Sequence, residues 1–279
     1  MTMPAVNVPD LLRRHEIHPK KSLGQNFLVD SSALQKIVAA AELPVDAAVL
    51  EIGAGLGSLT RVLAGACRRV IAVEIDQRLM PLLQEMTAGL KNVELVHGDM
   101  LQLNPGSLLG SESTYSVVAN IPYYITSALI RHLLEAPIKP NRVVLTVQRE
   151  VADRICALPG DLSLLALSVQ VYGTPSNVLR IPAGAFYPAP DVDSAVLRVD
   201  LYEVPRIPAA QMDWFFKLAR AGFSQKRKTL RNALSGGLGW KPEHAATLLT
   251  QSGIDPMRRA ETLTIEEWGQ LTKQASATT

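Results

Sequence analysis

The chain has 279 residues, 47% of them hydrophobic and 19% charged, with a net charge of +2, which suits one α/β core of ordinary size and a smaller second domain. It contains no run of about 18 apolar residues and no basic leader followed by an apolar stretch, so we expect a cytoplasmic protein without a membrane partner. The two cysteines and five histidines lack the spacing of a metal site or a disulfide framework, and no metal is expected.

The first expected element is a helix near the N-terminus. Ser31 or Ser32 can cap it, and Leu34, Ile37 and Val38 recur at helical spacing. We expect this helix to lie across the edge of the sheet that follows.

From about residue 46, short runs rich in valine, isoleucine and leucine alternate with helical stretches. This alternation predicts an α/β fold of the Rossmann-like, doubly wound kind, in which helices cover both faces of a mostly parallel sheet. The expected strands span 48–52, 69–74, 93–97, 115–119, 142–147, 164–172 and 194–202.

The character of the sequence changes near residue 205. Beyond it, helical patterns occupy 211–222, 226–234, 243–251 and 264–274, with glycine and proline between them. We therefore expect a domain at 1–205 that carries the sheet and a smaller, all-helical C-terminal domain at 206–279.

A glycine-rich turn follows the first expected strand. Gly53, Gly55 and Gly57 have the spacing GxGxG, which suits a sharp turn from strand to helix where a ligand approaches the backbone closely. A nicotinamide fingerprint would require glycine in place of Ser58, and no Walker lysine accompanies the glycines. Taken alone, the pattern is also that of an ordinary tight turn.

Acidic residues stand at the ends of the next two expected strands. Glu74 lies 21 residues past Gly53, where a carboxylate can bind both ribose hydroxyls, and Asp99 can accept a hydrogen bond from an adenine amino group. Each acid alone is more often a helix cap or a loop residue. Together with the glycines, they predict a site for an adenosine moiety.

The fourth expected strand runs into Asn120-Ile121-Pro122-Tyr123. At the mouth of the sheet, an asparagine carbonyl can accept a hydrogen bond from an adenine amino group, and a turn fixed by proline can direct an aromatic ring at the base. The same four residues also make an ordinary turn.

Basic residues cluster in two places. Lys20 and Lys21 lie near the start of the chain, and the stretch 217–231 holds six bases and no acid. Such clusters can follow a phosphate backbone. The alternative is a solvated helix face, which is the usual role of a run of charges.

Several blocks of the sequence, taken in order, resemble one known family, the adenine dimethyltransferases of ribosomal RNA, and specifically the bacterial small-subunit enzymes of the KsgA type. The resemblance covers about residues 20 to 268. Ala54 departs from it where proline is common, and Leu164-Leu165 stands where a Tyr-Gly pair is usual. The matching blocks are Lys20–Leu28, Glu51–Gly57, Glu74, Gly98–Asp99, Asn120–Tyr123, Val147–Arg154, Phe186–Ser194 and Phe223–Asn232.

The resemblance implies an enzyme that uses S-adenosylmethionine to dimethylate the exocyclic N6 of two adjacent adenines near the 3′ end of small-subunit (16S) ribosomal RNA. The implied partner is this RNA within the immature 30S subunit, and we expect the enzyme to act as a monomer. The implied cofactor contacts are Gln25, Asn26, Leu28, Gly53, Gly55, Glu74, Ile75, Asp99, Met100 and Asn120.

The resemblance also implies which residues meet the RNA. Tyr123 and Phe186 match the two aromatic positions expected on either face of the target adenine, although a place in the core is the alternative for Phe186. The implied catalytic residues are Asn120, Ile121, Pro122, Tyr123 and Phe186. The implied RNA contacts, from an N-terminal segment 1–30 and from the helical domain, are Lys20, Lys21, Lys226, Arg227, Lys228 and Arg231.

Two other functions compete with this one. The large-subunit rRNA adenine methyltransferases of macrolide resistance share the Gln-Asn-Phe and Asn-Ile-Pro-Tyr blocks but not, as a rule, the block at 226–232. A non-catalytic factor of ribosome assembly would not need acids at positions 74 and 99, yet Glu74 and Asp99 are both present.

Overall fold

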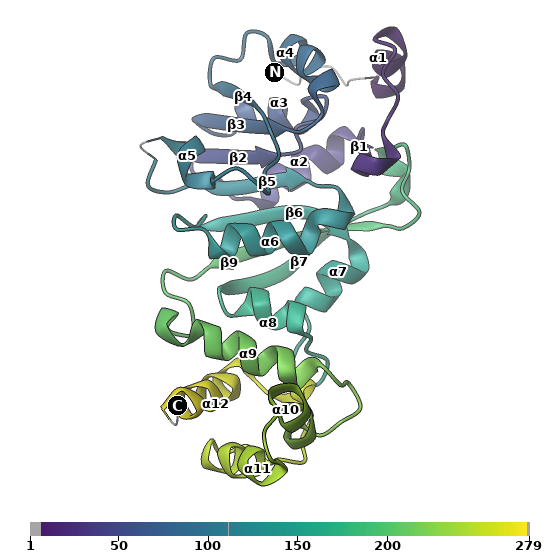
Figure 1. Cartoon of the computed structure of the whole chain (residues 1–279). Coiled ribbons are helices and arrows are strands. Elements are labelled where there is room, and N and C mark those ends of the chain that lie inside the picture. Colours follow the sequence, from purple (N-terminus) through teal and green to yellow (C-terminus); the bar gives the residue numbers. More distant parts are fainter. Residues whose placement is uncertain (1–6, 111, 278–279) are drawn as a thin grey trace. The chain divides into compact units, whose positions relative to one another are not determined.

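A computed structural model describes residues 7–110 and 112–277, and the chain forms two compact units (Figure 1). The first unit comprises the residues up to Ala152 together with Ser176–Leu201, and the second comprises Asp153–Pro175 together with the residues from Tyr202 onward. Residues 1–6 of the expected contact segment 1–30, and residues 278 and 279 of the expected domain 206–279, lie outside the described residues.

The expected division at residue 205 missed one segment, because residues 153–175 group with the second unit. Backbone hydrogen bonds explain this grouping. The N–H of Tyr202 donates to the carbonyl of Tyr172 (2.9 Å), and the N–H of Arg206 donates to the carbonyl of Val171 (3.0 Å). The second unit is therefore built from two separate stretches of the chain.

A seven-stranded sheet carries the first unit. From β4 to β6 neighbouring strands run parallel, and β9 is antiparallel to β6. The carboxyl ends of the parallel strands therefore meet at one edge of the sheet. The strand order is β4 (Val93–His97), β3 (Arg69–Glu74), β2 (Ala48–Ile52), β5 (Ser116–Asn120), β6 (Arg142–Gln148), β9 (Ser194–Leu201) and β7 (Gly173–Ile181).

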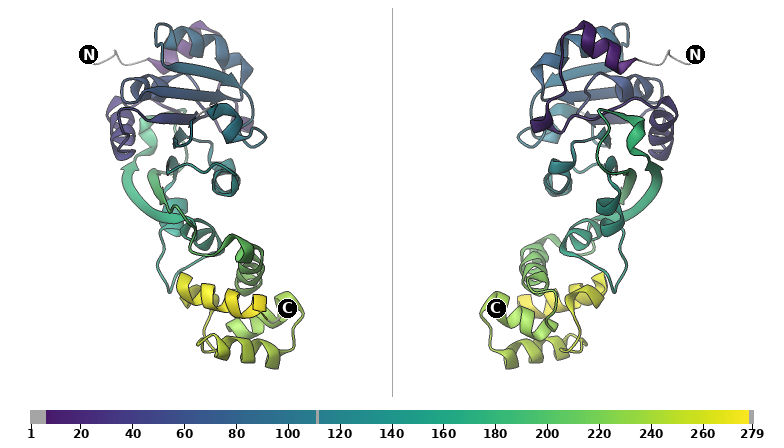
Figure 2. Two further views of the ribbon diagram at one scale, coloured as in Figure 1. Left: turned by 90° about the vertical axis from the view of Figure 1, so that its left-hand side faces the viewer. Right: turned by 90° about the vertical axis from the view of Figure 1, so that its right-hand side faces the viewer.

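Helices lie on both sides of this sheet (Figure 2), which confirms the expected fold class. Every residue of β2 is buried, as expected for a parallel strand covered on both faces. A second, two-stranded sheet pairs β1 (Phe27–Leu28) with β8 (Phe186–Tyr187). The helices from α1 to α7 are Val8–Arg14, Ser31–Ala40, Ser58–Ala64, Met80–Thr87, Pro105–Leu109, Thr126–Glu135 and Arg149–Ile155.

The helix α2 differs from its expected cap and place. Asp30 is its N-cap, accepting from the N–H of Ala33 (2.9 Å), so the cap precedes both serines. The helix lies on a face of the sheet and not across its edge, since Ile37 shares a core cluster with Val49 of β2 and Val144 of β6. In this position the apolar stripe of the helix is buried against the strands of the sheet.

The stretch 164–172, expected as a strand, is mostly the helix α8 (Leu164–Gln170). Ser163 caps this helix by accepting from the N–H of Ala166 (3.1 Å), and a short apolar run does not separate a helix from a strand by periodicity. The strand is instead β7, at the end of the sheet. The sequence did not indicate this strand, because it lacks a continuous apolar run. Its Pro175 and its exposed polar residues are typical of an edge strand.

The second unit also holds four further helices: α9 (Met212–Phe223), α10 (Leu230–Leu238), α11 (Pro242–Gln251) and α12 (Ile265–Ala277). Trp268 is fully buried and stacks on Phe223. The expected helix 226–234 was wrong at its start, because the N–H of Lys228 closes a turn on the carbonyl of Gln225 (3.0 Å) before α10 begins. Among the described residues, no helix combines the length and the apolar character needed to cross a bilayer.

Candidate active site

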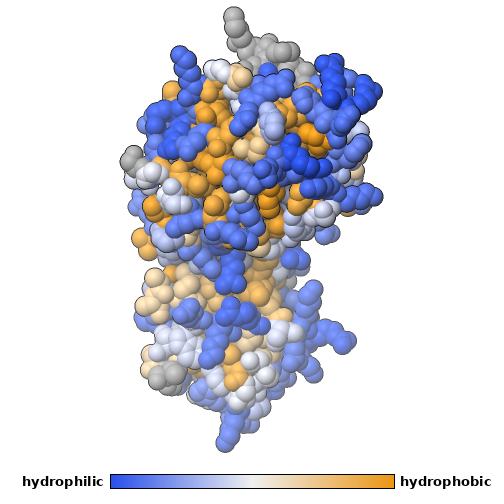
Figure 3. Space-filling model, turned by 45° about the horizontal axis from the view of Figure 1, so that its top comes forward, coloured by the Kyte–Doolittle hydropathy of each residue, from blue (hydrophilic) through white to orange (hydrophobic). Residues whose placement is uncertain are grey.

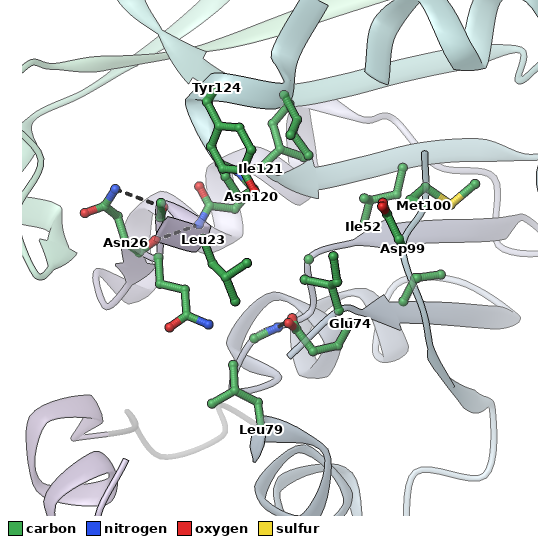
Figure 4. Close-up of a pocket in the computed structure, with 18 of the residues that line it drawn as sticks. Leu23, Asn26, Ile52, Glu74, Leu79, Asp99, Met100, Asn120, Ile121 and Tyr124 are labelled. Carbon is green, nitrogen blue, oxygen red and sulfur yellow. Dashed lines mark hydrogen bonds between the residues drawn. The ribbon is translucent and has the colours of Figure 1, made fainter. Parts of the chain in front are cut away.

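A cavity lies at the carboxyl ends of the parallel strands. Glu74, Asp99 and Asn120, which lie at or just beyond three strand ends, surround it (Figure 4). The sequence predicted this meeting of strand ends. The cavity is lined by Leu23–Phe27, Ile52, Gly53, Gly55, Val73–Ile75, Leu79, Gly98–Leu101 and Asn120–Ile125.

The glycine-rich turn forms the floor of the cavity between β2 and α3. Gly53 and Gly55 have φ angles of 75° and 58°, a left-handed conformation that other residues rarely adopt. A Cβ on Gly55 would lie 3.2 Å from the ring of Phe27. The absence of a side chain there lets the N-terminal segment pack directly on the turn.

Glu51 is buried immediately before this turn, with 1% of its surface exposed. Burial raises the pKa of its carboxyl to about 8, so the group is protonated at neutral pH. Its Oε2 atom has no hydrogen-bond partner among the described residues. Glu51 does not line the cavity, and its environment is that of a neutral acid beneath the turn.

Glu74 is held by two backbone groups. Its Oε2 accepts from the N–H of Gly55 (2.7 Å) and its Oε1 from the N–H of Asp76 (2.8 Å). Burial raises the pKa of this carboxyl. Each carboxylate oxygen can accept more than one hydrogen bond, so Glu74 can also accept from hydroxyl groups of a ligand.

Asp76 joins the N-terminal segment to the end of β3, a role that the sequence analysis missed. Its Oδ2 accepts from Gln25 Nε2 (2.9 Å) and from an Arg78 guanidinium nitrogen (2.6 Å). The hydrogen bond from Arg78 lowers the pKa of Asp76 to about 2. Gln25 Oε1 in turn accepts from the N–H of Lys20 (2.7 Å), so one buried carboxylate fixes the segment that closes one side of the cavity.

Asn120, the last residue of β5, has a fixed orientation. Its Nδ2 donates to the carbonyl of Asn26 (3.1 Å), and Asn26 Nδ2 donates to the carbonyl of Gly24 (3.3 Å). The amide nitrogen of Asn120 is therefore engaged by the N-terminal segment. Its carbonyl oxygen remains available as an acceptor at the cavity.

Tyr123 and Asp99 complete the polar groups of the site. The hydroxyl of Tyr123 is 2.7 Å from Ser194 Oγ, and burial raises its pKa. Asp99 Oδ1 accepts from the N–H of Leu101 (3.0 Å), and the buried Met100 and the half-exposed Ile75 line the same cavity. A carboxylate in a cavity with apolar walls suits a flat base that carries an amino group.

The family model for ribosomal RNA adenine dimethylase matches residues 17–276. The chain belongs to this family. Its relatives include the ribosomal RNA small subunit methyltransferase A of Dehalococcoides mccartyi strain CBDB1, 47% identical over 94% of this chain and 90% of the relative. The protein of the same name from Moorella thermoacetica is 44% identical over 94% of each chain.

Two solved structures share the fold over most of the chain. The 23S rRNA methyltransferase ErmE has a TM-score of 0.71 at 29% identity and covers 90% of this chain and 100% of its own. A dimethyladenosine transferase from Plasmodium falciparum has a TM-score of 0.75 at 25% identity and covers 89% and 98%. The family and the Rossmann-like methyltransferase fold expected from the sequence are thus confirmed.

Two of the expected dimethylase site residues lie apart from the cavity lining. Leu28 and Phe186 pair across β1 and β8, are 3% and 4% exposed, and belong to the core cluster on the face of the sheet that α2 covers. The other expected cofactor and catalytic residues all line the cavity.

The expected RNA contacts divide between the two units. Lys20 and Lys21 are exposed on the N-terminal segment of the first unit, whereas Lys226, Arg227 and Lys228 are exposed in a turn of the second. Arg231 lies in α10 and donates to Asn232 Oδ1 (3.2 Å).

On the face drawn in Figure 3, hydrophilic side chains surround apolar surface in the first unit.

Proposed function

We propose that this member of the family uses S-adenosylmethionine to dimethylate the N6 atoms of two adjacent adenines near the 3′ end of small-subunit ribosomal RNA. We propose further that its substrate is the immature small subunit, and that the enzyme acts as a monomer in the cytoplasm. The observation that carries the proposal is the fixed amide of Asn120 beside Glu74 and Asp99 at one cavity.

The donors and acceptors around the cavity fit S-adenosylmethionine. Glu74 offers buried carboxylate oxygens for ribose hydroxyls, and Asp99 offers one for an adenine amino group, with Ile75 and Met100 as apolar neighbours. The left-handed Gly53 and Gly55 leave the backbone open to close approach. When bound, this cofactor supplies a methyl group on a sulfonium.

The remaining chemistry is mainly a matter of position. Methyl transfer is an in-line displacement, so the enzyme must hold the adenine N6 atom close to the methyl carbon at the right angle. Asn120 Oδ1 and the carbonyl of Ile121 can accept the two amino hydrogens. This arrangement favours a pyramidal nitrogen with a more available lone pair. After the transfer, the positively charged methylated nitrogen can release a proton to water.

The target adenine must leave its stack to reach such a site. Tyr123, with its hydroxyl bound at Ser194, offers an aromatic face, and stacking offsets roughly 1 to 3 kcal/mol of the cost per base. Phe186 is proposed as the second aromatic residue. Because it is 4% exposed, this role requires β8 to shift when RNA binds.

The choice of the small subunit is supported by the relatives. The curated relatives in Dehalococcoides and Moorella carry the small-subunit name at 44% to 47% identity, whereas the 23S enzyme ErmE is 29% identical. The basic block Lys226–Asn232, unusual in the large-subunit enzymes, is also present.

The test is transfer of radioactive methyl groups from labelled cofactor to unmethylated small subunits, large subunits and naked RNA, followed by mapping of the modified bases. We expect dimethyladenosine at two neighbouring positions near the 3′ end of the small-subunit RNA, and no label with the Asn120→Ala protein. Label confined to large subunits would refute the proposal.

A further inference from the structure

The two consecutive tyrosines that follow Pro122 have different environments. Tyr123 is half-buried and bound through its hydroxyl to Ser194. Tyr124 lines the same cavity, yet 64% of its surface is exposed. Figure 4 shows it beside Asn120 at the cavity. A large aromatic side chain that lines a cavity and stays exposed there is available to a ligand.

The ring of Tyr124 also packs against the N-terminal segment. Gly24 has a φ of 56°, and a Cβ there would lie 3.3 Å and 3.4 Å from two ring carbons of Tyr124 and 3.2 Å from Pro122 Cβ. The ring therefore packs against the backbone of the N-terminal segment. A ring that already packs on backbone along one side loses less conformational entropy on stacking than a wholly free one does.

Two lysines precede Gly24 in the N-terminal segment, and Lys20 Nζ lies 3.8 Å from Asp76 Oδ1. Gly24 directly follows the short helix η1 (Lys21–Leu23), and Lys20 and Lys21 are exposed at its start. Aromatic rings beside cations are typical of grooves for single-stranded nucleic acid, where bases stack and the backbone meets positive charge. The surroundings of Tyr124 therefore favour a nucleotide over a peptide or an apolar ligand.

We propose that Tyr124 is a stacking surface for the nucleotide next to the target adenine. This inference rests on the proposed function and adds a subsite to it. When one of two adjacent adenines leaves its stack, the other loses a stacking partner as well, and an exposed aromatic ring at the cavity mouth replaces that partner.

The test compares KM for small subunits among three variants. Tyr124→Ala should raise KM by about 5- to 150-fold, the range found when a stacking aromatic is removed. Tyr124→Phe keeps the ring and should rescue most of that loss. Val45→Ala, which truncates an 88% exposed apolar side chain of the same unit, controls for the removal of surface area. The demethylated cofactor should bind Tyr124→Ala within about threefold of wild type, which also shows that the variant is folded.

A second measurement identifies the base. Small subunits can be reconstituted with RNA that carries an abasic nucleotide in place of one of the two adenines. If Tyr124 stacks on that neighbour, the two changes remove the same interaction. Combining the abasic substitution with Tyr124→Ala should then raise KM no more than the larger of the two single changes does.

The outcomes separate this inference from the function on which it rests. If the wild-type protein labels no small subunits, the proposed function fails and the inference with it. If the wild type is active and Tyr124→Ala keeps its KM, only the inference is overturned. A loss of cofactor affinity equal to the rise in KM would assign Tyr124 to the cofactor and would likewise overturn it.

Discussion

Replacing Asp76 with asparagine is expected to destabilise the first unit and to weaken cofactor binding. The substitution removes a carboxylate whose side chain is 2% exposed and that accepts from Arg78 and Gln25. An asparagine at this position can still accept from Gln25. It cannot hold the guanidinium of Arg78 as an ion pair, so the charge interaction is lost while the shape is kept.

The pKa of Asp76 gives the magnitude. It lies at about 2 in the folded protein against an ordinary value of 3.8, a difference of nearly two pKa units, or roughly 2 kcal/mol. Because the folded pKa is the lower one, this stabilisation is fully present above pH 3.8 and is lost as the pH falls through 2. About half of it should remain at pH 3. If all of it acted on the N-terminal segment, the cofactor Kd would rise by at most about 30-fold.

The assay is urea denaturation followed by circular dichroism, at pH 7 and at pH 3, with calorimetric titration of the demethylated cofactor. Asp10→Asn is the control, since it removes ion pairs to the exposed Arg13 and Arg14 within one helix, and such surface pairs contribute little. An Asp76→Asn protein as stable as wild type at pH 7, or a deficit of equal size at both pH values, would refute the reasoning.

Three other predictions concern Asn120, the buried Glu51 and the basic turn of the second unit. Asn120→Ala should abolish methyl transfer while the cofactor Kd, measured by calorimetry, stays within about tenfold of wild type. In urea denaturation, the Glu51→Gln protein should become more stable relative to wild type as the pH rises from 5 to 8. The buried acid of the wild type keeps its proton up to about pH 8, and holding this proton costs stability above the unfolded pKa. A stability difference that does not change with pH would contradict the prediction. Reversing the charges of Lys226 and Lys228 should reduce the slope of log Kd for small subunits against log salt by about 1.5, with no change in cofactor affinity.

The sequence predicted which strand ends meet at the cavity, because each of them follows the same local pattern of an apolar run and then a polar residue. In parallel strands the carboxyl ends share one edge, so Glu74, Asp99 and Asn120 could be assigned to one cavity from their places after apolar runs. The glycine spacing then indicated where the backbone turns. None of this required knowledge of side-chain contacts.

What the sequence did not predict depends on contacts between distant residues. Asp76 stands two residues past Glu74 and resembles an ordinary loop acid, and its role appears only when Gln25, 51 positions away, reaches it. For a related reason the helix α8 was predicted as a strand, and the strand β7 was not predicted. An apolar run suits either element, and the choice was made by Ser163 at the helix start and by the edge position of β7.

The order of strands has a consequence for synthesis of the protein. In the sheet β9 lies between β6 and β7, although β7 leaves the ribosome first, and β8 and β9 are the partners of β1 and β6. Residues 186–201 thus arrive late and complete both sheets. A nascent chain that stops before them leaves the buried strand β6 with an open edge, which is a template for aggregation. Prematurely terminated products of this gene should therefore be insoluble or rapidly degraded, even when they contain every residue that lines the cavity.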